Sequence, residues 1–181
     1  MKKLIFTILA ICVFGLAANA QLVTSRGYGK KERKHNVWME FGVGTTTAKE
    51  NGKSLDIKIP SLSLDLRWTA PIGDWFAWDI FTLGATFIPN AEIFEFRIMT
   101  GPRVRFPFSE NFRLFLANDA GLHVSMLMES GWGFADEVLA GLDYKRFTAG
   151  LYYRMHFFRD NYNWKNGGSI NSLGLKVGFS F

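Results

Sequence analysis

Three side chains of the types found in hydrolytic triads lie in the second half of the chain, namely His123, Ser125 and Glu137. His123 and Ser125 are separated by one residue, so in a strand both would point to the same face. Such a set acts only when a base contacts the nucleophile and a third group orients the base, and spacing alone does not establish that geometry. We therefore expect a protein that is not an enzyme, with hydrolysis as an alternative.

The other reactive side chains predict neither a metal site nor a cofactor site. His35, His123 and His156 lie in separate segments, without the short spacings that are typical of zinc ligands. The Gly-Tyr-Gly segment at residues 27–29 has neither the preceding strand nor the following helix of a phosphate-binding loop. Lysine and arginine are spread along the chain instead of forming one basic face, so we expect no nucleic-acid partner.

The amino-terminal residues have the three parts of a secretory signal peptide. Lys2 and Lys3 form a cationic head, the run from Leu4 to Ala18 is mostly apolar, and small residues precede a cleavage site after Ala20. The apolar run is shorter than the roughly 20 residues that a membrane-spanning helix needs. We therefore predict a cleaved signal peptide at residues 1–20 and an exported protein.

Cleavage would leave 181 − 20 = 161 residues, with a net charge of (21 − 2) − 16 = +3 and without Cys12, the only cysteine. Residues 21–35 then form a basic tail. Its cationic residues are Arg26, Lys30, Lys31, Arg33 and Lys34. Because the tail has no apolar periodicity, we predict a solvated periplasmic segment, and a docking motif for a periplasmic partner is the alternative.

From residue 36 onward, apolar and polar residues alternate with a period of two, which is typical of strands with two unlike faces. The alternation predicts eight strands, with their runs at 37–43, 62–68, 75–87, 94–106, 114–126, 138–144, 147–157 and 173–181. In the third run, Trp78 and Ile80 are out of phase with Phe81, which predicts a bulge or else leaves the two faces of this strand unassigned. We predict a second bulge at Pro102, because proline lacks the N–H that a strand ladder needs.

The segments between these strands alternate in length. Short turns at 71–74, 107–111 and 145–146 face longer polar or glycine-rich loops at 45–54, 128–137 and 159–168, with a compact connection at 89–91. Short periplasmic turns opposite longer extracellular loops are typical of outer-membrane barrels. The sequence therefore predicts an all-β fold, an eight-stranded antiparallel up-and-down transmembrane β-barrel at residues 36–181.

The polar face of the predicted strands carries charges of both signs, which favours an enclosed polar lumen over the apolar cavity of a soluble barrel. We expect an ion network there, because charges surrounded by hydrocarbon need partners. Its predicted members are Glu40, Asp65, Arg67, Glu95, Arg97, Arg103, Arg105, Arg113, Asp119, His123, Asp143, Arg154 and Lys176. If Arg105 paired with Arg113 across the turn, Glu95 would lie opposite His123.

The last strand places its apolar residues on one face and stops on a phenylalanine that is in phase with them. These residues are Leu173, Leu175, Val177, Phe179 and Phe181. The ending resembles the closing strand of a bacterial outer-membrane β-barrel. We expect Phe179 and Phe181 to form the C-terminal barrel signal, with outer-membrane lipid and the barrel assembly machinery as partners. Aromatic residues near both ends of the strands resemble two interfacial girdles.

Three segments, at 138–147, 149–153 and 172–181, resemble the small outer-membrane β-barrel proteins of Bacteroidota, of the porin-family or PorT-like type. The resemblance covers nearly all of the predicted mature chain. It implies an integral protein of the cell outer membrane with eight strands, and it carries no catalytic residue. Eight strands leave an interior that side chains roughly fill, so the porin label does not imply a pore.

His156 is similar in position to the histidine in the last hairpin of the barrels that deacylate lipid A. That family has a Ser-Asn pair after its histidine, whereas Phe158 and Arg159 occupy those places here. The strand phase also turns His123 and Ser125 toward the lumen. A lipid A-modifying hydrolase is therefore the least favoured function.

We expect a non-enzymatic integral outer-membrane barrel whose lumen is filled by charged side chains. It would support the envelope or bind a surface partner through its extracellular loops. The predicted loop recognition residues are Trp132, Phe134, Tyr162 and Trp164. An accessory subunit of an envelope secretion or assembly complex, with a periplasmic protein partner, is the alternative that the basic tail indicates.

Overall fold

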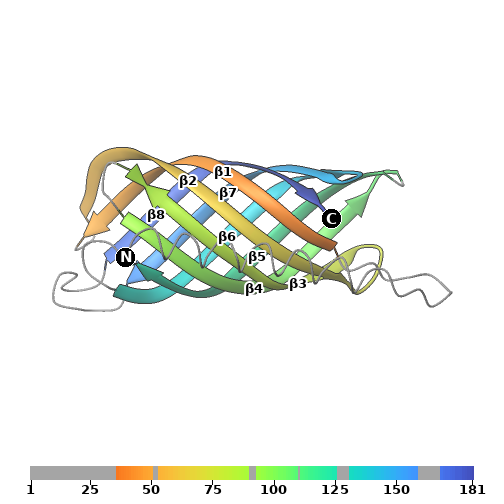
Figure 1. Cartoon of the computed structure of the whole chain (residues 1–181), viewed down its shortest axis with the longest axis horizontal. Coiled ribbons are helices and arrows are strands. Elements are labelled where there is room, and N and C mark those ends of the chain that lie inside the picture. The colour runs from red at the N-terminus through yellow and green to blue at the C-terminus, as the bar shows by residue number, and fades with distance from the viewer. Residues whose placement is uncertain (1–35, 51–52, 90–92, 110, 126–130, 159–167) are drawn as a thin grey trace.

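The alternating segments form eight strands. The computed structural model describes residues 36–50, 53–89, 93–109, 111–125, 131–158 and 168–181, so the predicted signal peptide and basic tail lie outside the described residues. The strands are β1 (Asn36–Glu50), β2 (Lys53–Pro71), β3 (Phe76–Ile88), β4 (Ile93–Pro107), β5 (Phe112–Ser125), β6 (Gly131–Tyr144), β7 (Phe147–Phe158) and β8 (Gly168–Ser180). Each strand pairs antiparallel with the next, and β8 pairs with β1, so the sheet closes (Figure 1). The predicted eight-stranded antiparallel barrel is confirmed.

Successive side chains of each strand point alternately into and out of the barrel. In β7, for example, Arg154 is fully buried, whereas the neighbouring Tyr153 is 41% exposed. The interior receives most of the charged residues and the outer face most of the large apolar ones, which reverses the usual arrangement of a protein in water. The strands are inclined to the long axis of the barrel, as closure of a sheet requires (Figure 1). Within the described residues, no helix has the length and apolarity to cross a bilayer.

The bulge predicted in the third strand is confirmed. Trp68 of β2 pairs with Phe81, but the next residue, Thr69, pairs with Asp79, so β3 contains one extra residue at this point. The same irregularity appears against β4. Because of the extra residue, Trp78 and Ile80 both face outward on one side of the bulge, while Asp79 is fully buried in the lumen.

Pro102 does not carry the bulge that we predicted there. The pairing of β4 with β5 runs from Thr100 with Ala120 to Arg103 with Ala117 without a change of register, so neither strand has an extra residue. The irregularity lies instead in β3, across from Thr100. Pro102 occupies an exposed position on the outer face, and the ladder continues beyond it.

The pairing of β4 with β5 differs by two residues from the expected register. Arg105 lies opposite Phe115, and Arg113 lies opposite Pro107, so the expected pairing of the two arginines is wrong. The reason is the length of the turn, since the N–H of Phe108 already donates to the carbonyl of Phe112 at 3.1 Å. The observed register spares two like charges from facing each other directly.

Two segments expected as loops are largely strand. β1 continues to Glu50 and β2 begins at Lys53, so most of residues 45–54 belongs to the barrel, and β6 already begins at Gly131. Polarity does not end these strands, because backbone groups make the ladder and polar side chains such as Thr46 find partners inside. The Thr46 and Ser172 hydroxyls hydrogen-bond across β1 and β8 at 2.8 Å.

Gly121 provides a test of how closely the strands pack. A Cβ atom added there would lie 2.7 Å from Met99 Cα on β4, which is closer than real Cβ atoms approach. We therefore expect Gly121→Ala to lower the free energy of unfolding by about 1–3 kcal/mol, because a strand has to move. The control is Gly73→Ala in the turn after β2, where nothing lies within 4 Å of the added atom. Urea unfolding in detergent measures the difference, and equal midpoints for the two variants would contradict the described packing.

Candidate functional site

The interior of the barrel is the most unusual environment in the molecule. Among the described residues it buries six acidic and six basic side chains, so their formal charges cancel. The acidic ones are Glu40, Asp65, Asp79, Glu95, Asp119 and Glu137, and the basic ones are Arg67, Arg97, Arg103, Arg105, Arg154 and Lys176. Together they come from all eight strands. Buried charges are tolerated when they are paired and hydrogen-bonded, and the two equal sets make such pairing feasible.

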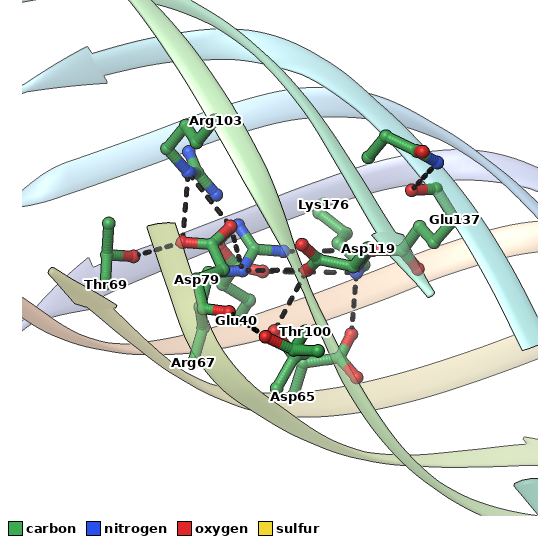
Figure 2. A network of polar contacts seen from close by, with 12 residues as sticks. Glu40, Asp65, Arg67, Thr69, Asp79, Thr100, Arg103, Asp119, Glu137 and Lys176 are labelled. Carbon is green, nitrogen blue, oxygen red and sulfur yellow. Dashed lines mark hydrogen bonds and ion pairs between the residues drawn. The ribbon is translucent and has the colours of Figure 1, made fainter. Parts of the chain in front are cut away.

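Arg67 of β2 lies at the centre of one half of this network. Its Nη1 donates to Glu40 Oε1 at 2.9 Å, and its Nε lies 3.5 Å from Asp79 Oδ2 and 3.7 Å from Asp119 Oδ2. Its Nη2 lies 3.8 Å from Glu137 Oε1. One guanidinium thus reaches carboxylates of β1, β3, β5 and β6, and Figure 2 shows these side chains converging within the lumen.

Asp65 and Glu137 lie at the centre of the other half. Asp65 forms ion pairs with Arg97, with Lys176 at 2.8 Å and with Arg154 at 3.5 Å. Glu137 accepts a hydrogen bond from Arg154 Nε at 2.7 Å and also pairs with Lys176. Arg154 and Lys176 therefore each bridge carboxylates of β2 and β6, and the contact of Arg67 with Glu137 joins the two halves of the network.

Polar and aromatic side chains complete the packing around these ions. The Thr86 hydroxyl accepts from Arg154 Nη1 at 2.9 Å and from Arg97 Nη1 at 2.5 Å. The Tyr152 ring lies under the Arg154 guanidinium, with 4.8 Å between the cation and the ring centroid. Tyr152 also belongs to a buried apolar cluster with Phe115, Ala117 and Leu139. The interior therefore combines a charged centre with an apolar patch.

Toward the short turns, arginines fill the interior. Arg103 Nε lies 3.1 Å from Asp79 Oδ2, and Thr69 donates to the same carboxylate at 2.6 Å (Figure 2). Arg105 Nη2 donates to the carbonyl of Gly73 at 2.8 Å. Arg113 and Asp143 lie opposite each other on β5 and β6, and both are only half-buried. They occupy the rim of the lumen, whereas the other predicted network members are buried within it.

Three buried residues were missing from the predicted network, namely Asp79, Glu137 and His156. The bulge hid the orientation of Asp79, and Glu137 was assigned to a loop that proves to be part of β6. Glu137 could have been placed from the phase of its neighbour, since Val138 is outward-facing. His156 likewise alternates with outward-facing Phe157.

The structure does not assemble His123, Ser125 and Glu137 as a triad. Glu137 lies against Arg154 and Lys176. The His123 ring stacks on His156, with 4.7 Å between the ring centroids. Ser125 lies on the same inward face, with Glu95 as its cross-strand neighbour. The carboxylate beside the histidines is therefore Glu95 and not Glu137.

Glu95, His123 and His156 form a separate cluster at the end of the lumen away from the short turns. Glu95 Oε2 lies 2.7 Å from His156 Nδ1, and one ligand atom from each of the three residues falls within 4.8 Å of the other two. All three side chains are buried. They come from β4, β5 and β7, so sequence spacing could not bring them to notice.

The outer face carries the exposed aromatic residues. Trp132 and Phe134, which we expected in a loop, lie on the outer face of β6 and are 52% and 47% exposed. Tyr162 and Trp164 lie outside the described residues. At the other end of the barrel, Phe179 and Phe181 pack edge to face, with 5.0 Å between ring centroids.

The sequence matches no protein-family model and no curated protein. The structure is similar to that of neisserial surface protein A, with a TM-score of 0.55 and 13% identity, over 80% of this chain and 97% of that one. It is also similar to the outer membrane enzyme PagL, with a TM-score of 0.60 and 16% identity, over 78% of this chain and 98% of that one. At these identities the likeness concerns the fold alone. The chain therefore has the fold of the small eight-stranded outer-membrane β-barrels.

Proposed function

We propose that this protein is an integral outer-membrane barrel of the porin-family or PorT-like type. It acts without catalysis, as a closed scaffold that supports the envelope or presents its loop end to a surface partner. One observation carries the proposal: an ion network built from all eight strands fills the lumen, while the outer face exposes large apolar side chains. This distribution suits hydrocarbon outside the barrel and paired charges inside it.

The outer face supports the membrane location. Outward-facing Val43, Leu151 and Leu175 are each more than half exposed, as are similar residues on other strands. In water, a continuous apolar surface of this kind would drive association, whereas acyl chains would cover it. Two polar pairs on this face satisfy each other, since Asn118 Nδ2 donates to Asp136 Oδ1 at 2.7 Å and Trp78 Nε1 donates to Thr100 Oγ1 at 2.9 Å.

Exposed aromatic residues gather near both ends of the strands, where a bilayer would place its headgroups. Trp75, Phe108, Tyr144 and Phe147 belong to the short-turn end, and Phe87, Trp132, Phe134 and Phe157 to the opposite end. We therefore assign Trp132 and Phe134 an anchoring role at the headgroup level in place of loop recognition. Recognition by Tyr162 and Trp164 stays a prediction.

The filled interior supports a scaffold in preference to a pore. A water channel would require the separation of ion pairs such as Arg67 with Glu40, and each separated charge would remain in a poorly solvated interior. The non-enzymatic part of the proposal is supported by the engagement of Glu137 with Arg154 and Lys176, away from the two histidines. The partners implied are outer-membrane lipid, the barrel assembly machinery and a surface or periplasmic protein.

The membrane location predicts how charges on the outer face act. Leu151 lies midway along β7 and is 59% exposed. We expect Leu151→Arg to lower the free energy of unfolding in a bilayer by about 2–4 kcal/mol, because the charge enters hydrocarbon. The amount of folded Leu151→Arg protein in the outer-membrane fraction should therefore fall. The mobility shift between unboiled and boiled samples measures this folded amount.

The matched control for Leu151→Arg is Ile72→Arg. Ile72 is similarly exposed at 53%, but it lies in the short turn after β2. This variant should accumulate like the unaltered protein. A barrel recovered from the periplasmic fraction, or equal tolerance of both substitutions, would contradict the proposed location.

The ion network should be needed for the stability of the barrel. Arg67→Met removes the cation shared by Glu40, Asp79, Asp119 and Glu137. Because buried carboxylates then lack a partner, we expect the free energy of unfolding to fall by about 3–5 kcal/mol. Arg113→Met at the half-buried rim is the control and should change it far less. Unfolding by urea in detergent, followed by tryptophan fluorescence, compares the two variants.

The closed lumen predicts the electrical behaviour of the protein. Reconstituted into a planar lipid bilayer, the purified barrel should give no stepwise ion conductance, because side chains of all eight strands occupy the interior. A reproducible conductance step of uniform size would contradict the scaffold proposal and favour a channel.

A further inference from the structure

The Glu95–His123–His156 cluster differs from the rest of the ion network in the partner of its carboxylate. The other five buried carboxylates each pair with an arginine or lysine. Within the part of the chain that the structure describes, the ion pair of Glu95 runs instead to His156. The carboxylate is therefore placed beside a side chain that is itself a metal ligand when neutral.

Glu95 and His156 each have a buried polar atom that makes neither a hydrogen bond nor the Glu95–His156 ion pair among the described residues. These atoms are Glu95 Oε1 and His156 Nε2, and both side chains are at most 1% exposed. Buried polar atoms in folded proteins are almost always partnered by protein, water or an ion. Glu95 Oε1 and His156 Nε2 are therefore available as ligand atoms for a metal ion.

The donor set suits a particular class of cation. Two imidazole nitrogens and one carboxylate oxygen are typical ligands of zinc and of other first-row transition metals, and they are poor ligands for calcium. Zinc bonds of about 2.0–2.2 Å place ligand atoms roughly 3.3 Å apart. In this cluster the ligand atoms lie within 4.8 Å of one another, so small side-chain rotations would bring them to that spacing.

The position of the cluster adds a structural reason for a metal. The histidine rings already stack, at an interplanar angle of 19°, and the Phe157 carbonyl lies 3.3 Å from His123 Nε2. The three residues belong to three different strands, β4, β5 and β7. A shared ion would therefore tie together three strands at the end of the barrel that carries the longer connections.

We propose that Glu95, His123 and His156 form a binding site for one divalent transition-metal ion of the zinc class at this end of the lumen. The site holds the ion as a structural link between β4, β5 and β7. It requires no opening of the barrel centre, because its residues lie beyond the arginine and lysine network. The proposal does not depend on the membrane location, and each can fail without the other.

Cobalt binding to the full chain folded in detergent tests the proposal. The protein is prepared without a histidine tag and treated with EDTA, and Co²⁺ is added while the visible ligand-field absorption is followed. We expect one Co²⁺ per barrel, displaced by Zn²⁺. Glu95→Gln and His156→Gln should each weaken binding at least as much as the roughly tenfold loss that follows removal of an outer-shell partner.

His35→Gln is the matched control, since it removes the one other histidine of the chain. It should bind Co²⁺ like the unaltered protein. The mobility shift between unboiled and boiled samples shows which variants are folded. A second measurement needs no variant, because Zn²⁺ that binds the folded state should raise the unfolding temperature of the unaltered barrel increasingly as the Zn²⁺ concentration rises.

Two results would overturn the proposal. The first is a folded, unaltered barrel that shows neither Co²⁺ absorption nor a Zn²⁺-dependent shift, which would leave only the ion pair of Glu95 and His156. The second is binding that persists in folded Glu95→Gln and His156→Gln, or that is lost in His35→Gln. Either pattern would place the ion elsewhere in the chain.

Discussion

The cancellation of charge inside the lumen is the constraint on which the rest of the structure depends. Alternation along eight strands forces every second side chain inward, and among the described residues those buried side chains include twelve charged groups. A group such as Arg67 is tolerable only because carboxylates from four other strands lie within reach. The strand register and the bulge in β3 both serve that mutual proximity.

The bulge in β3 shows how a local irregularity of one strand contributes to the balance of acidic and basic side chains in the lumen. It turns Asp79 inward, where the carboxylate meets Arg67 and Arg103. Without it, the residues beyond that point would present their other face, because a shift of one residue exchanges the two faces of a strand. Trp78 and Ile80 would then enter a lumen that is already filled with charge. The irregularity therefore supplies one of the six acids that the basic side chains need.

Strand alternation was enough to predict the barrel, the positions of most inward charges and the bulge in β3. It could not give the register of β4 with β5, because turn closure at Phe108, and not side-chain pattern, determines how far the strands are offset. It placed Glu95 near His123 but did not predict that His156 joins them, since β7 does not pair with β4 or β5 and meets them only across the lumen of the closed sheet. Glu137 was not predicted as a network member for a third reason. Glycine-rich segments resemble loops in sequence even when their backbone continues a strand ladder.

The pairing of β1 with β8 has a consequence for how the molecule forms. The N–H of Phe181 donates to the carbonyl of Val37 at 3.0 Å, and the seam continues to Glu50 opposite Gly168. One hydrogen-bonding edge of β1 is therefore covered only by β8, the strand that is farthest from it in sequence. Until β8 arrives, the growing sheet keeps two open edges, and such edges readily pair with foreign chains. The barrel therefore closes only when its first and last strands pair. Until then, the open edges of the incomplete sheet must be protected from pairing with other chains.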